Sequence, residues 1–271
     1  MNSVFITGIA GFIGRHAAKE FTEKGWQVSG CDKKLGTAVE HLPQKRIAPF
    51  DVLLHCAANI ESLDRRYAGT LAQFDDINLD CTLLEWLSIH RPERLIWMSS
   101  CVAAAPDPLD PYSTVKATGE AMALHFGRQT GVPVHVLRPF SGYGEDQSET
   151  YPFAAIGKRA CERQDPLTVW SDSIRDWIHV DDIIRYILAA AEQRLPVGVP
   201  VAIGTGRPTS FCQLAQMFFN AVGYSPQIIV DSGKPQGHPY RVLQSEPLIR
   251  PTVTLEQGIQ RFLEANKNVT R

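Results

Sequence analysis

The chain has 271 residues, with 27 lysines and arginines, 29 aspartates and glutamates, and a formal net charge of −2. This length suits one large domain or two small ones with a substantial core. The near balance of charge argues against nucleic-acid or membrane-surface binding as the main role.

The six cysteines are spread along the sequence without a C-x-x-C pair. Their spacing predicts reduced core thiols and no structural zinc site. The amino terminus enters an apolar strand without a basic segment and a long apolar run, and no stretch approaches membrane-spanning length. We therefore expect a soluble cytoplasmic protein that binds no metal, no nucleic acid and no membrane.

The first 32 residues follow the order strand, glycine turn, helix, strand and acid. Residues 3–6 are a short apolar run that leads into Thr7-Gly8-Ile9-Ala10-Gly11-Phe12-Ile13-Gly14. Apolar residues then recur at helical spacing until Gly25, and a second apolar run, residues 26–31, ends at Asp32. This order is typical of a dinucleotide-binding site.

Each glycine of the turn has a predicted task. Gly8 permits a tight turn, Gly11 lets the backbone approach the pyrophosphate, and Gly14 lets the helix pack closely on the sheet. The helix that begins near Phe12 and Ile13 offers free N–H groups and its positive dipole end to the phosphates. The alternative is an ordinary strand, turn and helix with packing glycines.

Asp32 indicates which dinucleotide is bound. We expect its carboxylate to accept hydrogen bonds from the adenosine ribose hydroxyls and to repel the extra phosphate of NADP. NAD is therefore the favoured cofactor, although Lys33 and Lys34 beside this acid leave NADP open.

The following segments alternate between strands and helices. Residues 51–58 form an apolar strand that ends in the small residues Cys56, Ala57 and Ala58, which either admit a bulky ligand or simply pack closely. A helix is expected over residues 78–89, a strand over 94–98, a helix after Pro111 and a strand over 132–137. This alternation predicts a parallel, doubly wound sheet.

Tyr112 and Lys116 are spaced for proton-transfer chemistry. Residues four apart share one face of a helix, so the ammonium can stabilise a phenolate that takes a proton from a hydroxyl. Ser99 and Ser100 follow the strand of residues 94–98, at the sheet edge where ligands bind in open α/β folds. Alone, the Tyr-Lys spacing also arises by chance on solvated helices.

Together these motifs resemble the extended short-chain dehydrogenase/reductase family, and within it the NAD-dependent nucleotide-sugar epimerase/dehydratase group. The resemblance rests on Thr7–Gly14, His55–Ala58, Asn78, Ser99–Ser100, Tyr112–Lys116, Arg138–Phe140, Arg175–Asp182 and Ile203–Gly206. It implies a Rossmann-type domain over residues 1–142, to which residues 177–204 return, and a smaller α/β substrate-binding domain over 143–271. It also implies NAD on the first domain, a nucleotide-diphosphate sugar between the two domains, and a homodimer formed through a helical bundle.

The resemblance also implies roles for single residues. Tyr112 is the catalytic acid/base, Lys116 tunes it and holds the nicotinamide ribose, and Ser100 binds the reacting hydroxyl. The cofactor-binding residues are expected to be Gly8, Gly11, Phe12, Ile13, Gly14, Asp32, Lys33, Cys56, Ala57, Ala58, Asn78, Ser99, Tyr112, Lys116, Pro139 and Phe140. The substrate-binding residues are expected to be Ser100, Ser141, Arg175 and Arg241, the two arginines as a diphosphate clamp.

Some residues of the Arg175–Asp182 segment have structural interpretations. Arg175 could instead form an ion pair with Asp181 or Asp182. His179 is expected to be a hydrogen-bonded core histidine, and the two aspartates are expected to cap a helix that starts at Ile183.

Three departures from the family pattern bear on function. Most of a strand and a helix is missing between Asp32 and residue 51, so the adenine pocket must be built differently. Ser141 stands where an asparagine commonly contacts substrate. Cys101 and Val102 follow Ser100 where the family's dehydratases carry an acid pair, and a thiol and a valine cannot eliminate water by acid/base chemistry.

The sequence therefore favours reversible oxidation, which is 4-epimerisation through a keto sugar. The alternatives are an NAD(P)H-dependent ketoreductase, a dehydratase, and a non-catalytic dinucleotide-binding subunit.

Overall fold

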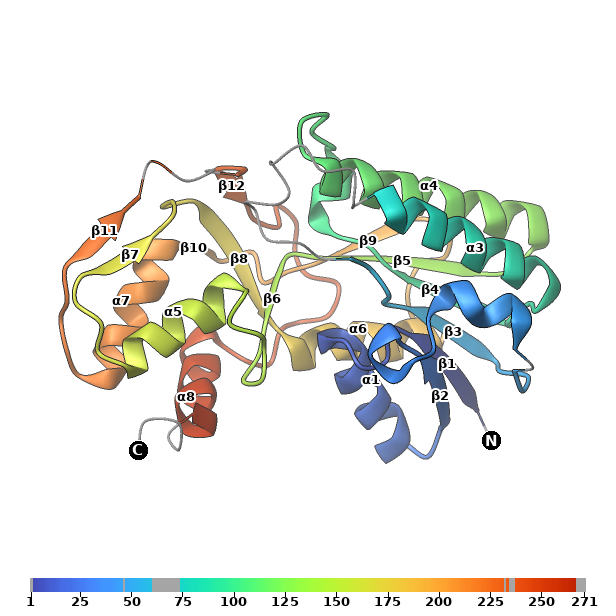
Figure 1. The fold of residues 1–271 in the computed structure, drawn as a ribbon, viewed down its shortest axis with the longest axis horizontal. Helices are drawn as coiled ribbons and strands as arrows, with labels where there is room; N and C mark the ends of the chain where they lie inside the picture. Colours follow the sequence, from blue (N-terminus) through green and yellow to red (C-terminus); the bar gives the residue numbers. More distant parts are fainter. Residues whose placement is uncertain (1, 46, 60–73, 232, 234–236, 267–271) are drawn as a thin grey trace. The chain divides into compact units, whose positions relative to one another are not determined.

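The computed structural model describes residues 2–45, 47–59, 74–231, 233 and 237–266. These residues form two compact units, each with its own core (Figure 1). The first unit contains the described residues of 2–139 and 184–202, and the second contains those of 140–183 and 203–266.

The first unit is built on a six-stranded sheet of order β2-β1-β3-β4-β5-β9. Its strands are β1 (Ser3–Thr7), β2 (Gln27–Cys31), β3 (Val52–His55), β4 (Arg94–Met98), β5 (Val134–Pro139) and β9 (Pro200–Ile203). Every pair from β2 to β5 is parallel. All four residues of β3 are buried, which is the pattern of a strand covered on both faces.

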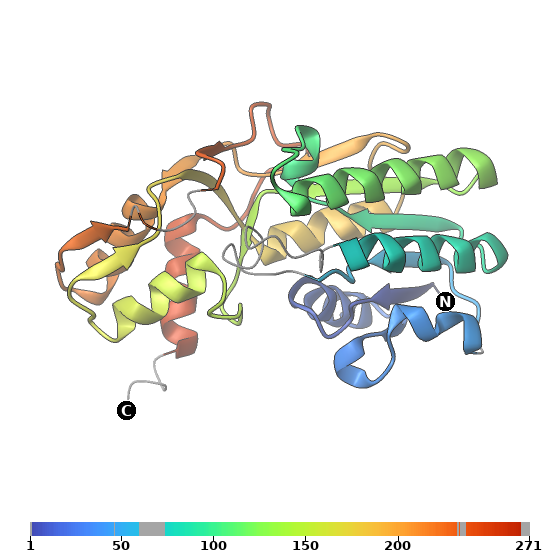
Figure 2. The ribbon, with the colours of Figure 1, turned by 45° about the horizontal axis from the view of Figure 1, so that its top comes forward.

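Helices cover both faces of this sheet. They are α1 (Phe12–Glu23), α3 (Asp75–Ile89), α4 (Pro111–Thr130) and α6 (Val180–Ala191). Figures 1 and 2 show α3 and α4 side by side on one face, and α1 and α6 on the other. Asp110 caps the start of α4 by accepting a hydrogen bond from the Tyr112 N–H, and Gly131 ends the helix with a φ of 77°. The predicted parallel, doubly wound sheet is confirmed.

The strand order places the ligand-binding edge of the sheet. Successive crossovers reverse direction between β1 and β3, and in open α/β sheets ligands bind outside the carboxyl ends of the strands at this point. The glycine turn follows β1 there, and Cys56–Ala58 follow β3.

Strand β2 lies at the edge of the sheet because the chain after it is short. The 3-10 helices Lys33–Leu35 and Val39–Gln44 lie between β2 and β3, and no strand occurs there among the described residues. Val39 and Leu42 from this segment are buried in the core of the first unit. The expected shortening is therefore real, and the remaining residues contribute to the core.

The second unit combines two small sheets with three helices. Its elements are β6 (Ser141–Tyr143), α5 (Pro152–Cys161), β7 (Leu167–Val169), β8 (Ile174–His179), β10 (Pro208–Ser210), α7 (Phe211–Val222), β11 (Ile228–Val230), β12 (Tyr240–Arg241) and α8 (Leu255–Asn266). Strand β8 pairs in parallel with β6 and β12 and antiparallel with β10, while β7 pairs with β11. Phe153, Phe218 and Phe262 meet edge to face in its core.

Two predictions about local structure are wrong. Helix α6 begins at Val180 instead of Ile183, so Asp181 and Asp182 lie inside its first turn and do not cap it. Asp182 instead accepts hydrogen bonds from the backbone N–H groups of Thr252 and Val253, at 2.9 and 3.1 Å. Helix α3 begins at residue 75, three positions before the expected start at 78.

The six cysteines are all free, as expected, but they are not all core residues. Cys31 is buried in the core of the first unit, whereas Cys81 is exposed on α3. The prediction of buried thiols is therefore wrong for Cys81.

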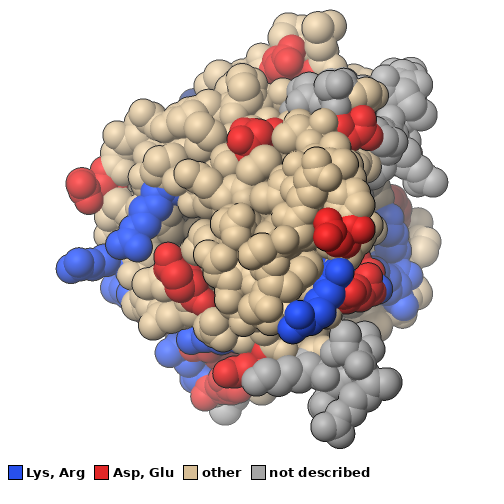
Figure 3. Space-filling view, turned by 90° about the vertical axis from the view of Figure 1, so that its left-hand side faces the viewer, with Lys and Arg blue, Asp and Glu red and all other residues tan. Residues whose placement is uncertain are grey.

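On the described part of the face in Figure 3, acidic and basic side chains are interspersed and do not gather by sign. Among the described helices, none has the length and apolar character required to cross a membrane.

Candidate active site

The glycine turn after β1 leaves a cradle that side chains in place of its glycines would fill. Gly8 has a φ of +72°, and a Cβ atom there would lie 2.7 Å from the Ala57 nitrogen. A Cβ atom on Gly14 would overlap the Gly8 carbonyl oxygen, so α1 can pack this closely only with glycine. Gly11 precedes α1, and neither a side-chain cap nor an acidic residue occupies its described first turn. The uncapped N–H groups and the open cradle fit a pyrophosphate.

Asp32 is held rigidly beside this turn. It is 8% exposed, and its two carboxylate oxygens accept hydrogen bonds from the N–H groups of Ala10 at 3.1 Å and Lys34 at 2.8 Å. Each oxygen keeps a further lone pair that could accept from a ribose hydroxyl. The Lys33 ammonium donates to the Asn59 side-chain oxygen at 2.6 Å and so links this segment to the loop after β3.

A buried chain of polar groups fixes the ends of β1 and β3. The Thr7 hydroxyl lies 2.7 Å from His55 Nδ1, and His55 Nε2 lies 2.9 Å from Asp80 Oδ1. The Thr7 oxygen also accepts a hydrogen bond from the Ala57 N–H at 3.3 Å. The backbone that carries Cys56, Ala57 and Ala58 is therefore anchored at the ligand-binding edge.

The thiol of Cys56, which follows β3 at this edge, is uncharged. Burial raises the pKa of its thiol to about 12, although the charge of Lys116 acts in the opposite direction. With its pKa raised this far, the thiol is protonated at neutral pH and does not act as a nucleophile.

The two serines after β4 present hydroxyl groups to the same edge. The Ser99 hydroxyl is buried and has no hydrogen-bond partner among the described residues. The Ser100 oxygen accepts from the Val102 N–H at 3.5 Å, at the start of the 3-10 helix Cys101–Ala104. A buried hydroxyl without a partner is uncommon, and a bound ligand would satisfy it.

Tyr112 and Lys116 lie on one face of α4, as their spacing predicts. The Lys116 ammonium lies 5.9 Å from the centre of the Tyr112 ring, and both side chains are half-buried. The helix is fixed to β5 by a two-pronged ion pair in which Arg138 Nε donates to the buried Glu120 at 2.7 Å. Tyr112 and Lys116 therefore lie on a helix that is firmly anchored to the sheet.

The remaining cofactor candidates differ in burial. Asn78 is exposed on α3, Pro139 is buried at the end of β5, and Phe140 is half-buried in the second unit. The sequence analysis missed Asp76 and its partner Asn59. Asp76 accepts hydrogen bonds from the Asn59 backbone N–H at 2.7 Å and from its side-chain N–H at 2.9 Å. An acid in the first turn of a helix is the local signal, but its partner lies 17 residues away.

The second unit brings three of the four predicted substrate residues onto one sheet face, while the fourth, Ser100, lies in the first unit. Arg175 on β8 and Arg241 on β12 are directly paired in a parallel register, so their side chains leave the same face. Ser141 on β6 is paired with Trp177, two residues after Arg175, and shares that face. We call Ser141, Arg175, Trp177 and Arg241 the arginine face.

Arg175 is a largely buried cation. It is 8% exposed, its guanidinium lies 5.3 Å from the Phe211 ring centre, and one nitrogen donates to the Ile174 carbonyl at 2.9 Å. Asp176 points to the opposite face, where it accepts hydrogen bonds from the N–H groups of Thr205 and Gly206 at 2.8 Å each.

His179 is a core histidine, as predicted. Its Nε2 lies 3.2 Å from Glu145, and its Nδ1 lies 3.4 Å from Asp181, which also pairs with Arg261 at 2.8 Å. Burial alone would lower the pKa of His179, but its two carboxylate partners outweigh burial and raise it to about 9. Nδ1 also accepts a hydrogen bond from the Asp181 backbone N–H at 3.2 Å, so His179 joins the end of β8 to the start of α6 and has a structural role.

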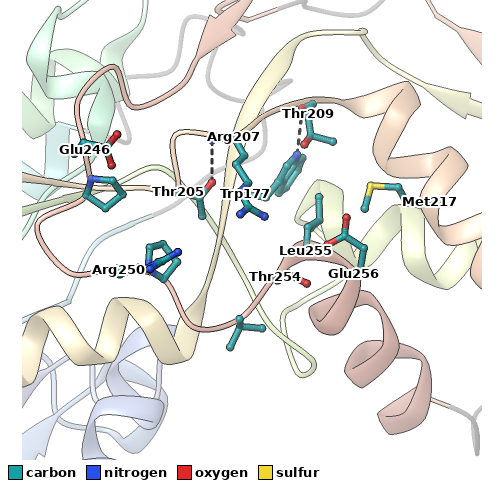
Figure 4. Close-up of a pocket in the computed structure, with 13 residues that line it drawn as sticks. Trp177, Thr205, Arg207, Thr209, Met217, Glu246, Arg250, Thr254, Leu255 and Glu256 are labelled. Carbon is teal, nitrogen blue, oxygen red and sulfur yellow. Dashed lines mark hydrogen bonds between the residues drawn. The ribbon is translucent and has the colours of Figure 1, made fainter.

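A cavity of about 320 Å³ also lies in the second unit (Figure 4). Trp177 and Thr209 line one side of it, with Arg207 beside the indole ring. Its lining includes neither Ser141 nor the two predicted diphosphate ligands, Arg175 and Arg241.

These features define a Rossmann-type dinucleotide-binding enzyme with a Tyr-Lys pair. Residues 4–204 match the NAD dependent epimerase/dehydratase family, and the chain belongs to this family. It is an NAD-dependent enzyme of the epimerase/dehydratase type.

Individual relatives agree with this class. A putative UDP-glucose 4-epimerase of Methanocaldococcus jannaschii is 25% identical, and 99% of each chain is aligned. A GDP-L-fucose synthase of Sinorhizobium fredii is 24% identical, with 97% of this chain and 94% of the relative aligned. The crystal structure of a Thermotoga maritima UDP-glucose 4-epimerase with UDP-glucose has a TM-score of 0.83 at 23% identity, covering 99% of this chain and all of the other. That structure shares the fold.

Proposed function

We propose that this protein is a nucleotide-sugar 4-epimerase in which Tyr112 moves the proton of the reacting hydroxyl. The observation that carries the proposal is the Tyr112–Lys116 pair on α4, in a unit where Ser100 also ends a strand at the ligand-binding edge. The absence of an acid pair after Ser100 in the sequence, together with the relatives named 4-epimerases, favours epimerisation over dehydration.

The residues divide the work as follows. Ser100 donates a hydrogen bond to the sugar oxygen, and the Tyr112 phenolate, stabilised by Lys116, takes the hydroxyl proton. Bound NAD supplies the chemistry of reversible hydride acceptance. Tyr112 later returns the proton to the sugar oxygen, so the cycle needs no exchange of protons with solvent.

The geometry of the first unit supports most of the proposed cofactor residues. The cradle of Gly8, Gly11 and Gly14 would hold the pyrophosphate, with Phe12 and Ile13 starting the helix above it. Asp32 would accept from the adenosine ribose. The Ser99 hydroxyl, the small residues after β3, Pro139 and Phe140 would line the nicotinamide end. Lys33 would lie beside Asp32 at the adenosine ribose, and Asn78 would contribute from α3.

The arginine face supports a diphosphate in the substrate. Two guanidiniums in neighbouring register positions can bind two phosphoryl groups bidentately, which ammonium groups do less well. Ser141 on the same face would contact the substrate by its hydroxyl.

The first test uses the nicotinamide that copurifies with, or is added to, the protein. A UDP-, GDP- or dTDP-sugar should reduce it and raise the near-ultraviolet absorbance of reduced nicotinamide. Tyr112→Phe should lower the rate about 10²- to 10⁴-fold, the range for loss of a positioned acid/base. Tyr224→Phe, a change in the second unit, should leave the rate unaltered.

Two results would count against the proposal. If no such sugar reduces the nicotinamide and Tyr112→Phe changes nothing, the non-catalytic binding role stands instead. If turnover requires added NADH or NADPH in stoichiometric amount, the protein is a ketoreductase, for which Ser100, Tyr112 and Lys116 also suffice.

We also propose that the protein is a cytoplasmic homodimer. The resemblance to extended short-chain dehydrogenases supports the dimer, and the six free cysteines are compatible with a reducing compartment. Light scattering after size-exclusion chromatography tests the dimer, which a monomeric mass would contradict.

A further inference from the structure

Asp76, in the first turn of α3, is a buried acid with an unused oxygen. Its side chain is 3% exposed, and Oδ1 takes both hydrogen bonds from Asn59. Oδ2 is buried and has no hydrogen-bond partner among the described residues. A buried carboxylate is costly unless a charge or a hydrogen-bond donor compensates it, so a compensating group is expected to face this oxygen.

The packing of α3 on α4 shows which residue faces Asp76. Both helices follow strands of one parallel sheet and run back along its face, so they are parallel to each other (Figure 2). Cys81 Sγ lies 3.8 Å from Met122 Sδ, and Asp80 Oδ2 lies 2.5 Å from the position that a Gly119 Cβ would take. About one helical turn nearer the amino end of each helix, Asp76 takes the place of Asp80 on α3 and Lys116 takes the place of Gly119 on α4. Asp76 therefore lies opposite Lys116.

The electrostatics of Asp76 agree with that placement. The pKa of its carboxyl is raised overall, first by burial and also by the charge of Asp80, while the Asn59 N–H groups and the positive charge of Lys116 lower it. Lys116 thus acts on Asp76 from the facing helix.

We propose that Asp76 is a positioning residue for Lys116: the carboxylate, held by Asn59, draws the ammonium toward α3 and limits how strongly it stabilises the Tyr112 phenolate. This inference rests on the proposed function, because it assumes that Lys116 serves Tyr112. It assigns to Asp76 and Asn59 a task in the reaction that the Tyr-Lys motif does not contain.

Other charged or titratable groups lie near Asp76, and the variants that test its role leave these groups unchanged. Asp80, one turn further along α3, is hydrogen-bonded to His55, and Asp75 on the same turn is exposed. Lys33 reaches Asn59 from the segment after β2. The thiol of Cys56 is neutral, since its pKa is about 12.

Asp76→Asn removes the charge but retains the shape and an oxygen for the Asn59 N–H. Without the negative charge of Asp76, the positive charge of Lys116 stabilises the Tyr112 phenolate more strongly. The phenolate should therefore form at lower pH. We expect the acid limb of the pH–rate profile to move down by roughly half a pH unit, a fraction of the effect of one close charge. A pH titration of tyrosinate absorbance in the absence of substrate should show the same shift. The signal of Tyr112 is the difference between each variant and the same variant carrying Tyr112→Phe.

Two variants serve as controls. Asp75→Asn removes an equal charge from the same helical turn but at an exposed side chain, and should shift neither titration. Asp76→Glu keeps the charge and should titrate as the parent chain does. If Asp76→Asn does not fold, Asp76→Ser replaces it, since it also removes the charge and serine is tolerated near a helix start.

The outcomes separate this inference from the proposed function. An unshifted or upward-shifted Asp76→Asn titration, or an equal shift for Asp75→Asn, overturns the role of Asp76. If that occurs while Tyr112→Phe is inactive, the epimerase proposal stands and this inference alone fails. If Tyr112→Phe remains fully active, the proposed function fails first.

Discussion

Single side chains of the proposed substrate site owe their placement to strand register. Arg175 and Arg241 are far apart in the sequence, yet their direct pairing across β8 and β12 puts both charges on one sheet face. A shift of one residue in either strand would turn one guanidinium to the opposite face. The pairing therefore has a measurable consequence for ligand binding.

Arg241→Gln should weaken binding of a nucleoside diphosphate. Loss of a charge-assisted hydrogen bond costs about 1.5–3 kcal/mol, which is roughly a 10- to 100-fold rise in Kd. The measurement is the rise in melting temperature caused by UDP, GDP or dTDP, since a ligand that binds only the native state raises it. Arg207→Gln, at an exposed arginine that lines the neighbouring cavity and is not one of the proposed diphosphate ligands, is the matched control. Equal loss in both variants would contradict a specific clamp.

At the scale of elements, the His179 cluster joins four parts of the second unit. His179 ends β8, Glu145 follows β6, and Asp181 lies in α6 and also binds Arg261 of α8. The pKa of His179 is raised to about 9, and the pKa of Asp181 is lowered to about 2 by the same interaction. Protonation of this cluster is therefore linked to folding.

The sign of the pH dependence follows from these shifts. Because the folded pKa of His179 exceeds its ordinary 6.5, its contribution is complete below pH 6.5 and is lost as pH rises through about 9. The contribution of Asp181 is complete above its ordinary 3.8 and is lost as pH falls toward about 2. The cluster is thus most stabilising between these two ordinary values.

Urea unfolding at several pH values tests this linkage. Between pH 6.5 and 9 the parent chain should lose roughly 2–3 kcal/mol of unfolding free energy that His179→Gln does not lose. His90→Gln, which alters an exposed histidine at the end of α3, should keep the parent slope. Parallel slopes for the parent and His179→Gln would show that the histidine is neutral in the folded protein.

At the scale of the whole molecule, the glycine cradle proposed for the cofactor and the arginine face proposed for the substrate belong to different compact units. The glycine cradle and Asp32 lie in the first unit, while the arginine face lies in the second. The chain enters the second unit after Pro139, returns at Ile184 and leaves the first unit again after Ala202. We therefore expect NAD to affect the first unit and a nucleoside diphosphate to affect the second.

Hydrogen exchange can distinguish the two sites. NAD should slow amide exchange in the turn between β1 and α1, and a nucleoside diphosphate should slow it in β8 and β12, because bound ligands stabilise the segments that contact them. Arg241→Gln should remove the second effect and leave the first. Protection of the β1–α1 turn by the diphosphate alone, without protection of β8, would contradict the assignment of the arginine face.

Sequence was sufficient wherever the chemistry is local. The glycine turn, Asp32 at the end of β2 and the four-residue spacing of Tyr112 and Lys116 each lie within one or two adjoining elements, so their geometry follows from the strand, the helix and the tight turn. The alternation of strands and helices likewise determined the parallel sheet, since crossover connections of this kind leave few arrangements.

Only the tertiary structure decided contacts between distant segments. Asp182 was expected to cap its own helix, yet it binds Thr252 and Val253, 70 and 71 residues away. Asp76 meets Asn59 and faces Lys116 because a loop after β3 and two helices converge at one sheet edge. Local spacing cannot specify such pairings, since they depend on which elements become neighbours and in what register. The sequence therefore determined the Tyr-Lys pair and its nucleotide cradle, and folding determined the charges that surround them.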